Sequence, residues 1–154
     1  MQKRLVRTQA RTQAPGSWLD LEELADVELT SEDAAHSIES ALSSTEGAGW
    51  RAAERGTQSI RLLFHAPQRV RRIRLRFDES EAERTQEFVL RWSPDGGRSY
   101  RDVVRQQYTF SPGGATSELE ELNVDLAGVT AFELTIIPDQ RGQVHASLAE
   151  WRVG

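Results

Sequence analysis

The sequence predicts an all-β fold, an antiparallel β-sandwich of the jelly-roll type with about eight strands. Apolar and polar residues alternate over short segments, the pattern of strands with one face in a core and the other in water. Turn signals rich in glycine and proline separate these segments, and no stretch has a long helical pattern. Together these observations indicate an antiparallel sandwich or barrel, and we favour the jelly roll.

The clearest element is a β-hairpin over residues 88–104. Phe88, Leu90 and Trp92 alternate with Val89, Arg91 and Ser93. The sequence Asp95-Gly96-Gly97 follows, and such residues tolerate the positive φ of a tight reversal. We expect the return strand to begin near Tyr100 and to run to Gln107.

Upstream of the hairpin the pattern is less regular. Residues 1–17 are expected to form a flexible lead, since they lack periodicity and contain Pro15-Gly16. The segment after Trp18 fits the start of a short helix, but alternation through Ala25, Val27 and Leu29 favours a strand over about 22–30. Residues 31–53 are polar, with a helical turn expected at 37–42, and a loop of this length is often functional.

The remaining strands follow from the same alternation. Ile60, Leu62 and Phe64 form a run that Pro67 is expected to end, and residues 73–77 form the next strand. A second long loop spans residues 108–116, and the last strands are expected at 122–126, 132–138 and 147–153. One domain therefore covers residues 18–154.

Composition narrows the class of protein. A chain of 154 residues fits one domain with a real core. The net charge of -5 argues against nucleic-acid binding, which depends on clustered cations. The chain has no cysteine, and it has neither the apolar run of a secretory signal nor the ~20 apolar residues that span a bilayer. We expect a soluble, cytoplasmic protein.

Five segments, in order and spacing, resemble a known family. They are Val27 to Glu32, Gly49-Trp50 followed by residues 58–64, residues 67–77, residues 88–97 with their Ser-Pro-Asp-Gly turn, and residues 146–153. Over residues 22–154 the chain resembles the discoidin domains, also called coagulation factor type C domains, within the galactose-binding-like jelly rolls. The resemblance implies binding rather than catalysis, through loops at one end of the sandwich that hold glycans, anionic lipid heads or protein partners.

The resemblance also raises the question of calcium. Many such domains carry a structural calcium ion near the first long loop. Here residues 38–47 lack the Asp-Gly-Asn turn of calcium-carrying relatives, although Glu39, Ser43 and Glu46 offer oxygen atoms. We expect no cofactor and keep a structural calcium ion as an open alternative. The disulfide of typical members is excluded because there is no cysteine.

A sugar site needs an aromatic face that stacks on pyranose C–H groups and planar polar groups that satisfy paired hydroxyls. Trp50 also fits the packing role that the family's tryptophan has at this place, whereas Tyr108 and Phe110 flank an exposed Pro-Gly-Gly turn. Trp92 and Trp151 lie on core phases of strands and are expected to pack. The candidate ligand-binding residues are His36, Trp50, Arg51, Arg55, Arg105, Gln106, Tyr108, Phe110 and Arg141.

One strip of arginines needs a separate interpretation. It consists of Arg69, Arg71, Arg72, Arg74 and Arg76. It could bind phosphate or an acidic partner, but we favour a solvated strand face paired with carboxylates across the sheet, among them Glu87, Glu118, Glu120 or Glu133.

Catalysis has little support in the sequence. His36, His65 and His145 have no metal-ligand spacing, and no Ser-His-Asp or glycine-rich phosphate motif occurs. Asp95 and Asp139 are adjacent to turns, where they are expected to accept from backbone N–H groups. The sequence therefore predicts a non-enzymatic module that binds a carbohydrate, with an intracellular protein-interaction or assembly domain as the alternative. The expected partners are a glycan or a protein, without nucleic acid or a membrane span.

Overall fold

The computed structural model describes residues 17–43 and 48–154. The predicted lead, residues 1–17, falls outside this part of the chain except for Ser17. The helices and strands in chain order are α2 (Leu21–Leu24), β2 (Ala25–Leu29), α3 (Ile38–Leu42), β3 (Trp50–Arg55), β4 (Gln58–Asp78), β5 (Arg84–Ser93), β6 (Arg101–Phe110), β7 (Ser117–Ile137), β8 (His145–Leu148) and β9 (Glu150–Val153).

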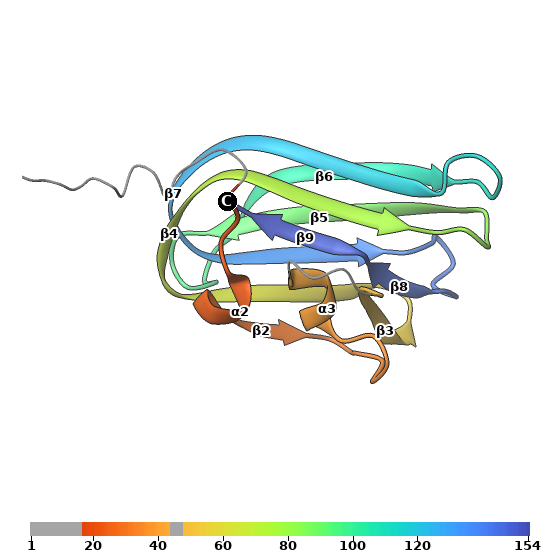
Figure 1. The fold of residues 1–154 in the computed structure, drawn as a ribbon, viewed down its shortest axis with the longest axis horizontal. Helices are drawn as coiled ribbons and strands as arrows, with labels where there is room; N and C mark the ends of the chain where they lie inside the picture. The colour runs from red at the N-terminus through yellow and green to blue at the C-terminus, as the bar shows by residue number, and fades with distance from the viewer. Residues whose placement is uncertain (1–16, 44–47) are drawn as a thin grey trace, which may run out of the picture.

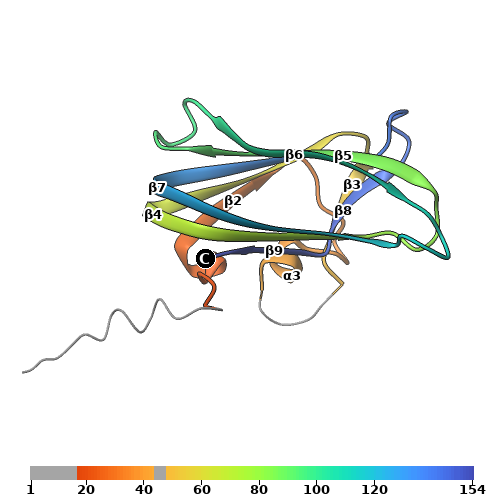
Figure 2. The same cartoon turned by 90° about the horizontal axis from the view of Figure 1, so that it is seen from above.

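The strands form a two-layered antiparallel sandwich. The large sheet has the order β2-β4-β7-β5-β6, while β9 pairs with the second half of β4, and β3 and β8 form a separate pair. β4 and β7 are long enough to serve both layers, and both curve round at the left of Figure 1 and return. Figure 2 shows the two layers from above. The predicted all-β sandwich is confirmed.

The core lies between the layers and is built from the alternating apolar positions. Ile60, Leu62, Phe88 and Leu90 are fully buried, as the alternation predicts. Trp151 is also fully buried, and its ring packs 6.3 Å from that of Phe132. Trp92 also packs against the core, as predicted, but it is only partly buried, and the guanidinium of Arg101 lies 5.2 Å from its ring.

Several predicted boundaries were wrong. The expected strand over 22–30 begins only at Ala25, because the side chain of Asp20 accepts from the N–H of Glu23 and starts the short helix α2. The helical turn at 37–42 is confirmed as α3, but the loop expected to continue to residue 53 contains β3. The single strand expected at 147–153 is two, β8 and β9, which have different partner strands.

Pro67 does not end its strand. β4 runs through it, and the pairing with β7 shifts register between Leu63 and Gln68. Proline has no N–H to donate, so it is tolerated where a strand bends and the regular ladder is interrupted. The strand expected at 122–126 likewise continues through residues 127–131 to join the one expected at 132–138.

The hairpin turn forms as predicted. Gly96 and Gly97 both have positive φ. The carboxylate of Asp95 accepts from the N–H and the hydroxyl of Ser99 and from the hydroxyl of Ser93. These hydrogen bonds, that of the Ser99 side chain first, lower the pKa of Asp95 to about 2. Asp139 accepts from the N–H of Gln143 in the same way.

Ion pairs neutralise most of the arginine strip, as predicted, but the partners are other carboxylates. Arg69 pairs with Asp125, Arg74 with Glu121, and Arg76 with Asp78 and Glu150. The guanidinium of Arg72 lies 3.6 Å from the ring of Trp18 instead, and Arg71 has no ion pair within the described residues. The expected partners were wrong because strand register, which the sequence does not show, decides which residues stand opposite one another.

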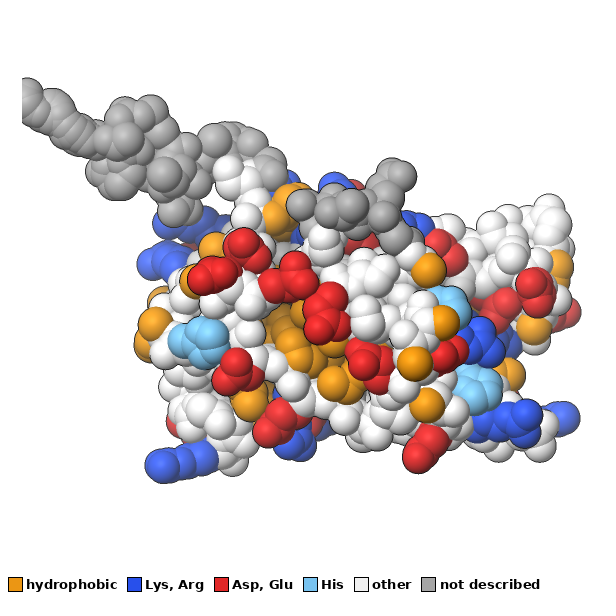
Figure 3. All heavy atoms as spheres, turned by 60° about the horizontal axis from the view of Figure 1, so that its bottom comes forward, with side chains coloured by type: hydrophobic (Ala, Val, Ile, Leu, Met, Phe, Trp, Pro, Cys, Tyr) orange, Lys and Arg blue, Asp and Glu red, His pale blue; other side chains and the backbone are white. Residues whose placement is uncertain are grey.

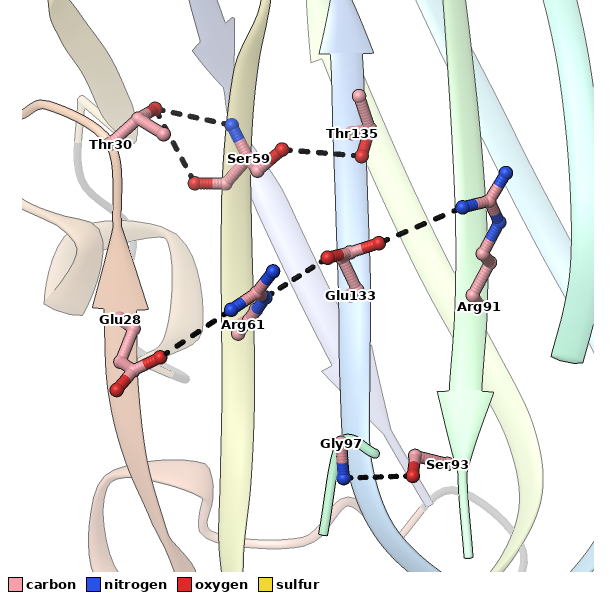
Figure 4. A network of polar contacts seen from close by, with 9 residues as sticks. All are labelled: Glu28, Thr30, Ser59, Arg61, Arg91, Ser93, Gly97, Glu133 and Thr135. Carbon is pink, nitrogen blue, oxygen red and sulfur yellow. Dashed lines mark hydrogen bonds and ion pairs between the residues drawn. The ribbon is translucent and has the colours of Figure 1, made fainter. Parts of the chain in front are cut away.

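The outer face of the large sheet has its own chain of charges (Figure 4). Glu133 of β7 accepts from Nε of Arg61 at 2.9 Å and lies 3.9 Å from Nη1 of Arg91. Arg61 also lies 3.9 Å from Glu28, and Nε of Arg91 lies 2.9 Å from Asp102. The pairs therefore link five of the six strands of the large sheet, from β2 through β4, β7 and β5 to β6.

Candidate functional site

The loops gather at one end of the sandwich, on the right of Figure 1. We call this the loop end, and it comprises residues 30–37, 51–58, 79–83, 111–116 and 138–145. The chain ends Ser17 and Gly154 of the described domain lie elsewhere, beside one another, next to the bends of β4 and β7. Because β4 and β7 both return to the loop end, it collects segments that are far apart in the sequence.

Backbone hydrogen bonds join three of these segments. The N–H of Asp33 donates to the carbonyl of Arg51 at 2.8 Å, and the N–H of Arg51 donates to the carbonyl of His36 at 3.2 Å. On the other side, the N–H of Gly56 donates to the carbonyl of Val144 at 3.0 Å. Residues 33–36, β3 and the 138–144 loop therefore form one continuous surface.

His36 is held by its neighbour Asp33. Nδ1 of His36 lies 3.3 Å from Oδ2 of Asp33, whose other oxygen accepts from the N–H of Ala35. The hydrogen bond from Ala35, followed by that from His36, keeps the pKa of Asp33 below its usual value. The histidine ring is thus positioned by an ionised carboxylate at the edge of the loop end.

His145 and Arg55 stand opposite each other in the β3-β8 pair. Nδ1 of His145 lies 3.0 Å from the carbonyl of Ala52, so this ring is fixed by the backbone of β3. The exposed Arg141 comes from the adjacent 138–144 loop, which approaches the β3-β4 turn at Gly142 and Gly56. Sequence reasoning did not select His145, because only the β3-β8 register brings it here.

Three exposed arginines at the loop end, Arg51, Arg55 and Arg141, have no ion pair within the described residues. The acidic residues near them are Asp33, the exposed Glu54, and Asp139 with its backbone hydrogen bond. Guanidinium donors in a fixed fork and carboxylate acceptors together are suited to vicinal hydroxyl groups. Side chains of both kinds are thus available here.

Trp50 is not part of this exposed surface. It is 1% exposed, and its indole N–H donates to the carbonyl of Ser31 at 3.2 Å. Gly49 before it has a positive φ, and a Cβ there would come 2.6 Å from the carbonyl oxygen of Leu148. The indole is therefore enclosed beneath the loop, so we correct its assignment from ligand contact to packing.

Phe110 is also buried, contrary to the exposure expected from the Pro-Gly-Gly turn. It is 0% exposed, and its ring packs 5.1 Å from that of Tyr108 and 4.8 Å from the guanidinium of Arg84. Tyr108 is half-buried, and its hydroxyl donates to the carbonyl of Ser117. The strand β6 continues to residue 110, so alternation turns Phe110 into the core.

A buried polar cluster lies beside Phe110 and was not predicted from the sequence. Arg84 donates to Glu79 at 2.7 Å and to the carbonyl of Pro138 at 2.7 Å. Gln86 links it to Glu118, whose pKa is raised to about 7, chiefly by burial. No sequence motif indicated this cluster, because its members come from three separate segments of the chain.

Arg105 and Gln106 are not brought together with the other candidates. Both lie within β6, and Arg105 pairs with Glu87 of β5 at 3.1 Å. For the calcium alternative, Glu39 is exposed in the first turn of α3 and Glu46 lies outside the described residues. Among residues 17–43 and 48–154, no group of three or more acidic, histidine or cysteine side chains is arranged to hold a metal ion.

Comparisons with known proteins identify the fold. No family model matches the sequence, and no curated protein matches it. A solved structure of CpGH89CBM32-5 from Clostridium perfringens, in complex with GalNAc-beta-1,3-galactose, is similar at 19% identity and a TM-score of 0.64, over 89% of this chain and 99% of that one. This chain has a discoidin-type jelly-roll fold.

Two further structures share this jelly roll. The CBM32 of AlyQ, in complex with 4,5-unsaturated mannuronic acid, has 16% identity and a TM-score of 0.62, over 85% of this chain and 95% of that one. A structure of reduced XRCC1 bound to the DNA pol beta catalytic domain has 17% identity and a TM-score of 0.61, over 85% and 95%. The galactose-binding-like jelly roll expected from the sequence is confirmed.

The two helices of the described residues are short, and neither could span a membrane.

Proposed function

We propose that this protein is a non-enzymatic carbohydrate-binding module and that it binds its glycan at the loop end. The proposed contacts are His36, Arg51, Arg55, Arg141 and His145. Trp50 and Phe110 are left out because they are buried. Arg105, Gln106 and Tyr108 lie outside the cluster and are at most peripheral contacts.

The observation that carries the proposal is the set of exposed arginines without ion pairs among the described residues. Elsewhere on the surface most arginines are neutralised by a carboxylate, as in the pairs of Arg61 and Arg69. The fold adds support, because similar structures include carbohydrate-binding modules in complex with a sugar ligand. The fixed rings of His36 and His145 supply further groups that bind hydroxyls.

The test is an amide chemical-shift titration of the full chain with a panel of neutral and acidic sugars. We expect shifts at residues 33–36, 51–55 and 141–145. Arg51→Gln and Arg55→Gln should each weaken binding about tenfold, the cost of one lost hydrogen bond from a charged group. The matched control is Arg98→Gln, an exposed arginine of the β5-β6 hairpin at the other end. Silence across the whole panel, or equal loss in the control, would overturn the proposal.

A protein-interaction or assembly role stays the second prediction. What favours it is that the fold also occurs in a structure of XRCC1 bound to a polymerase domain. The arginine strip is a weaker surface for it than the sequence indicated, because ion pairs neutralise most of its charge. This role would be favoured by a protein partner that co-purifies with the chain. Tyr108→Ala should then reduce binding of that partner, and sugars should have no effect on it.

The expected cytoplasmic location is likewise a prediction.

A further inference from the structure

An apolar groove with an acidic rim lies beside β2, the edge strand of the large sheet. Its volume is about 420 Å³, and it shares no lining residue with the proposed sugar site. Figure 3 shows it as an orange hollow ringed by red side chains. The floor consists of Ala25, Val27, Leu29, Ile38 and Leu42, contributed by β2 and α3.

The rim carries four carboxylates, those of Glu22, Asp26, Glu32 and Glu39, and no lysine or arginine is among the nine lining residues. Asp26 lies 3.0 Å from the exposed ring of His65, and Glu32 accepts from the N–H of Ile38. Glu22 and Glu39 are exposed and have no ion pair within the described residues. The groove therefore fits an occupant that is apolar and cationic at once.

The chain itself contains such a segment in residues 1–16. Its charged residues are Lys3, Arg4, Arg7 and Arg11, it has no acidic residue, and Leu5-Val6 is its apolar pair. The described chain begins at Ser17, and Glu22 on the groove rim comes five residues later. Five residues span at most about 18 Å, and the twelve from Val6 to Ser17 can reach about 40 Å. The groove is thus within reach of the segment, and the tether keeps the local concentration high.

We propose that residues 1–16 bind in this groove of the same molecule. Leu5 and Val6 cover the apolar floor, and the cations lie against the carboxylates of the rim. Binding removes the floor from water, and the charges on both sides give the contact its direction and its salt dependence.

The experiment uses the full chain, in which Thr8→Cys provides a single attachment point for a nitroxide label because the protein has no cysteine. Paramagnetic relaxation should broaden the amides of Val27, Leu29 and Ile38 several-fold more than those of residues 96–99 or 111–114. The effect should fall in 1 M salt, where the screening length is about 3 Å. Broadening that is uniform, absent or centred on another face would overturn the proposal.

Charge variants of the nitroxide-labelled chain test whether attraction between the cations of residues 1–16 and the carboxylates of the rim holds this segment in the groove. Lys3, Arg4, Arg7 and Arg11 changed together to glutamine should remove the selective broadening, and Glu22→Gln with Glu39→Gln should reduce it. The matched control is Glu81→Gln with Glu83→Gln, two exposed glutamates without ion pairs among the described residues, which should leave it unchanged. Broadening that persists in all variants would contradict the electrostatic part.

Mixing experiments separate the same chain from a second copy. An isotope-labelled chain without nitroxide is mixed with a nitroxide-bearing chain without isotope. We expect no broadening in the isotope-labelled chain. Broadening in this mixture as strong as within one labelled chain would assign the groove to a segment of another molecule and overturn the intramolecular contact.

Discussion

The outer face of the large sheet and the loop end both present arginines, but the arginines differ in whether a carboxylate pairs with them. On the sheet, Arg61 and Arg91 lie on either side of Glu133, whose side chain is only 13% exposed. At the loop end, Arg51 and Arg55 are exposed and have no ion pair among the described residues. The register of the large sheet sets Arg61 and Arg91 opposite Glu133, so these charges meet a partner. In the β3-β8 pair, Arg51 stands opposite Ser147 and Arg55 opposite His145, so neither has a carboxylate across from it and both stay available for a ligand.

The largest effect is expected from a change to Trp50, the buried side chain that packs beneath the loop end. Trp50→Ala should reduce the free energy of unfolding by about 3–5 kcal/mol, because it empties a buried site and removes the donor to Ser31. Chemical denaturation measures this, and Trp50→Phe should cost less. A loss under about 1 kcal/mol would mean that the indole is not structural and that the loop end has no rigid base.

The next effect concerns Glu118, below the loop end. Its pKa in the folded state is about 7, above the usual glutamate value of 4.5, so the folded state binds the proton more tightly than the unfolded state between these pH values. The stabilisation is complete below the unfolded pKa and is lost as the pH rises through the folded pKa. We expect unfolding free energy to fall by about 1–2 kcal/mol between pH 5 and pH 8. Glu118→Gln should flatten this profile, and an unchanged slope in that variant would contradict the assignment.

A smaller effect is expected on the sheet face. Glu133→Gln should cost about 1 kcal/mol, because Arg61 and Arg91 lose a shared and largely buried carboxylate. Glu28→Gln is the matched control, since Glu28 is exposed and lies 3.9 Å from Arg61, and it should cost less than about 0.5 kcal/mol. Equal values for both variants would remove the contrast between the sheet face and the loop end.

The smallest stability effect is expected at the loop end. Arg51→Gln and Arg55→Gln should each change the unfolding free energy by less than about 0.5 kcal/mol, although both should weaken glycan binding. Thermal unfolding and the titration described above measure the two quantities on the same samples. A clear loss of stability would show that these arginines are structural, and the distinction from Arg61 would no longer hold.

The fold class and much of its detail could be predicted from local sequence patterns. Alternation at Ile60, Leu62, Phe88 and Leu90 decided which face of each strand is buried, because the side-chain period of a strand is two. The turn at residues 95–97 was also predictable, since its chemistry is local. The position of α3 followed from nearby residues in the same way.

Which residues contact one another could not be predicted, because it depends on contacts between distant segments of the chain. Trp50 and Phe110 had to be moved from the ligand site to the core, because burial depends on segments distant in the chain. The position of His145 opposite Arg55 depends on the β3-β8 register. The partner of each arginine depends on the registers of β4, β5 and β7. Local periodicity carries no information on such long-range register, which is why the strands were predictable and the site largely was not.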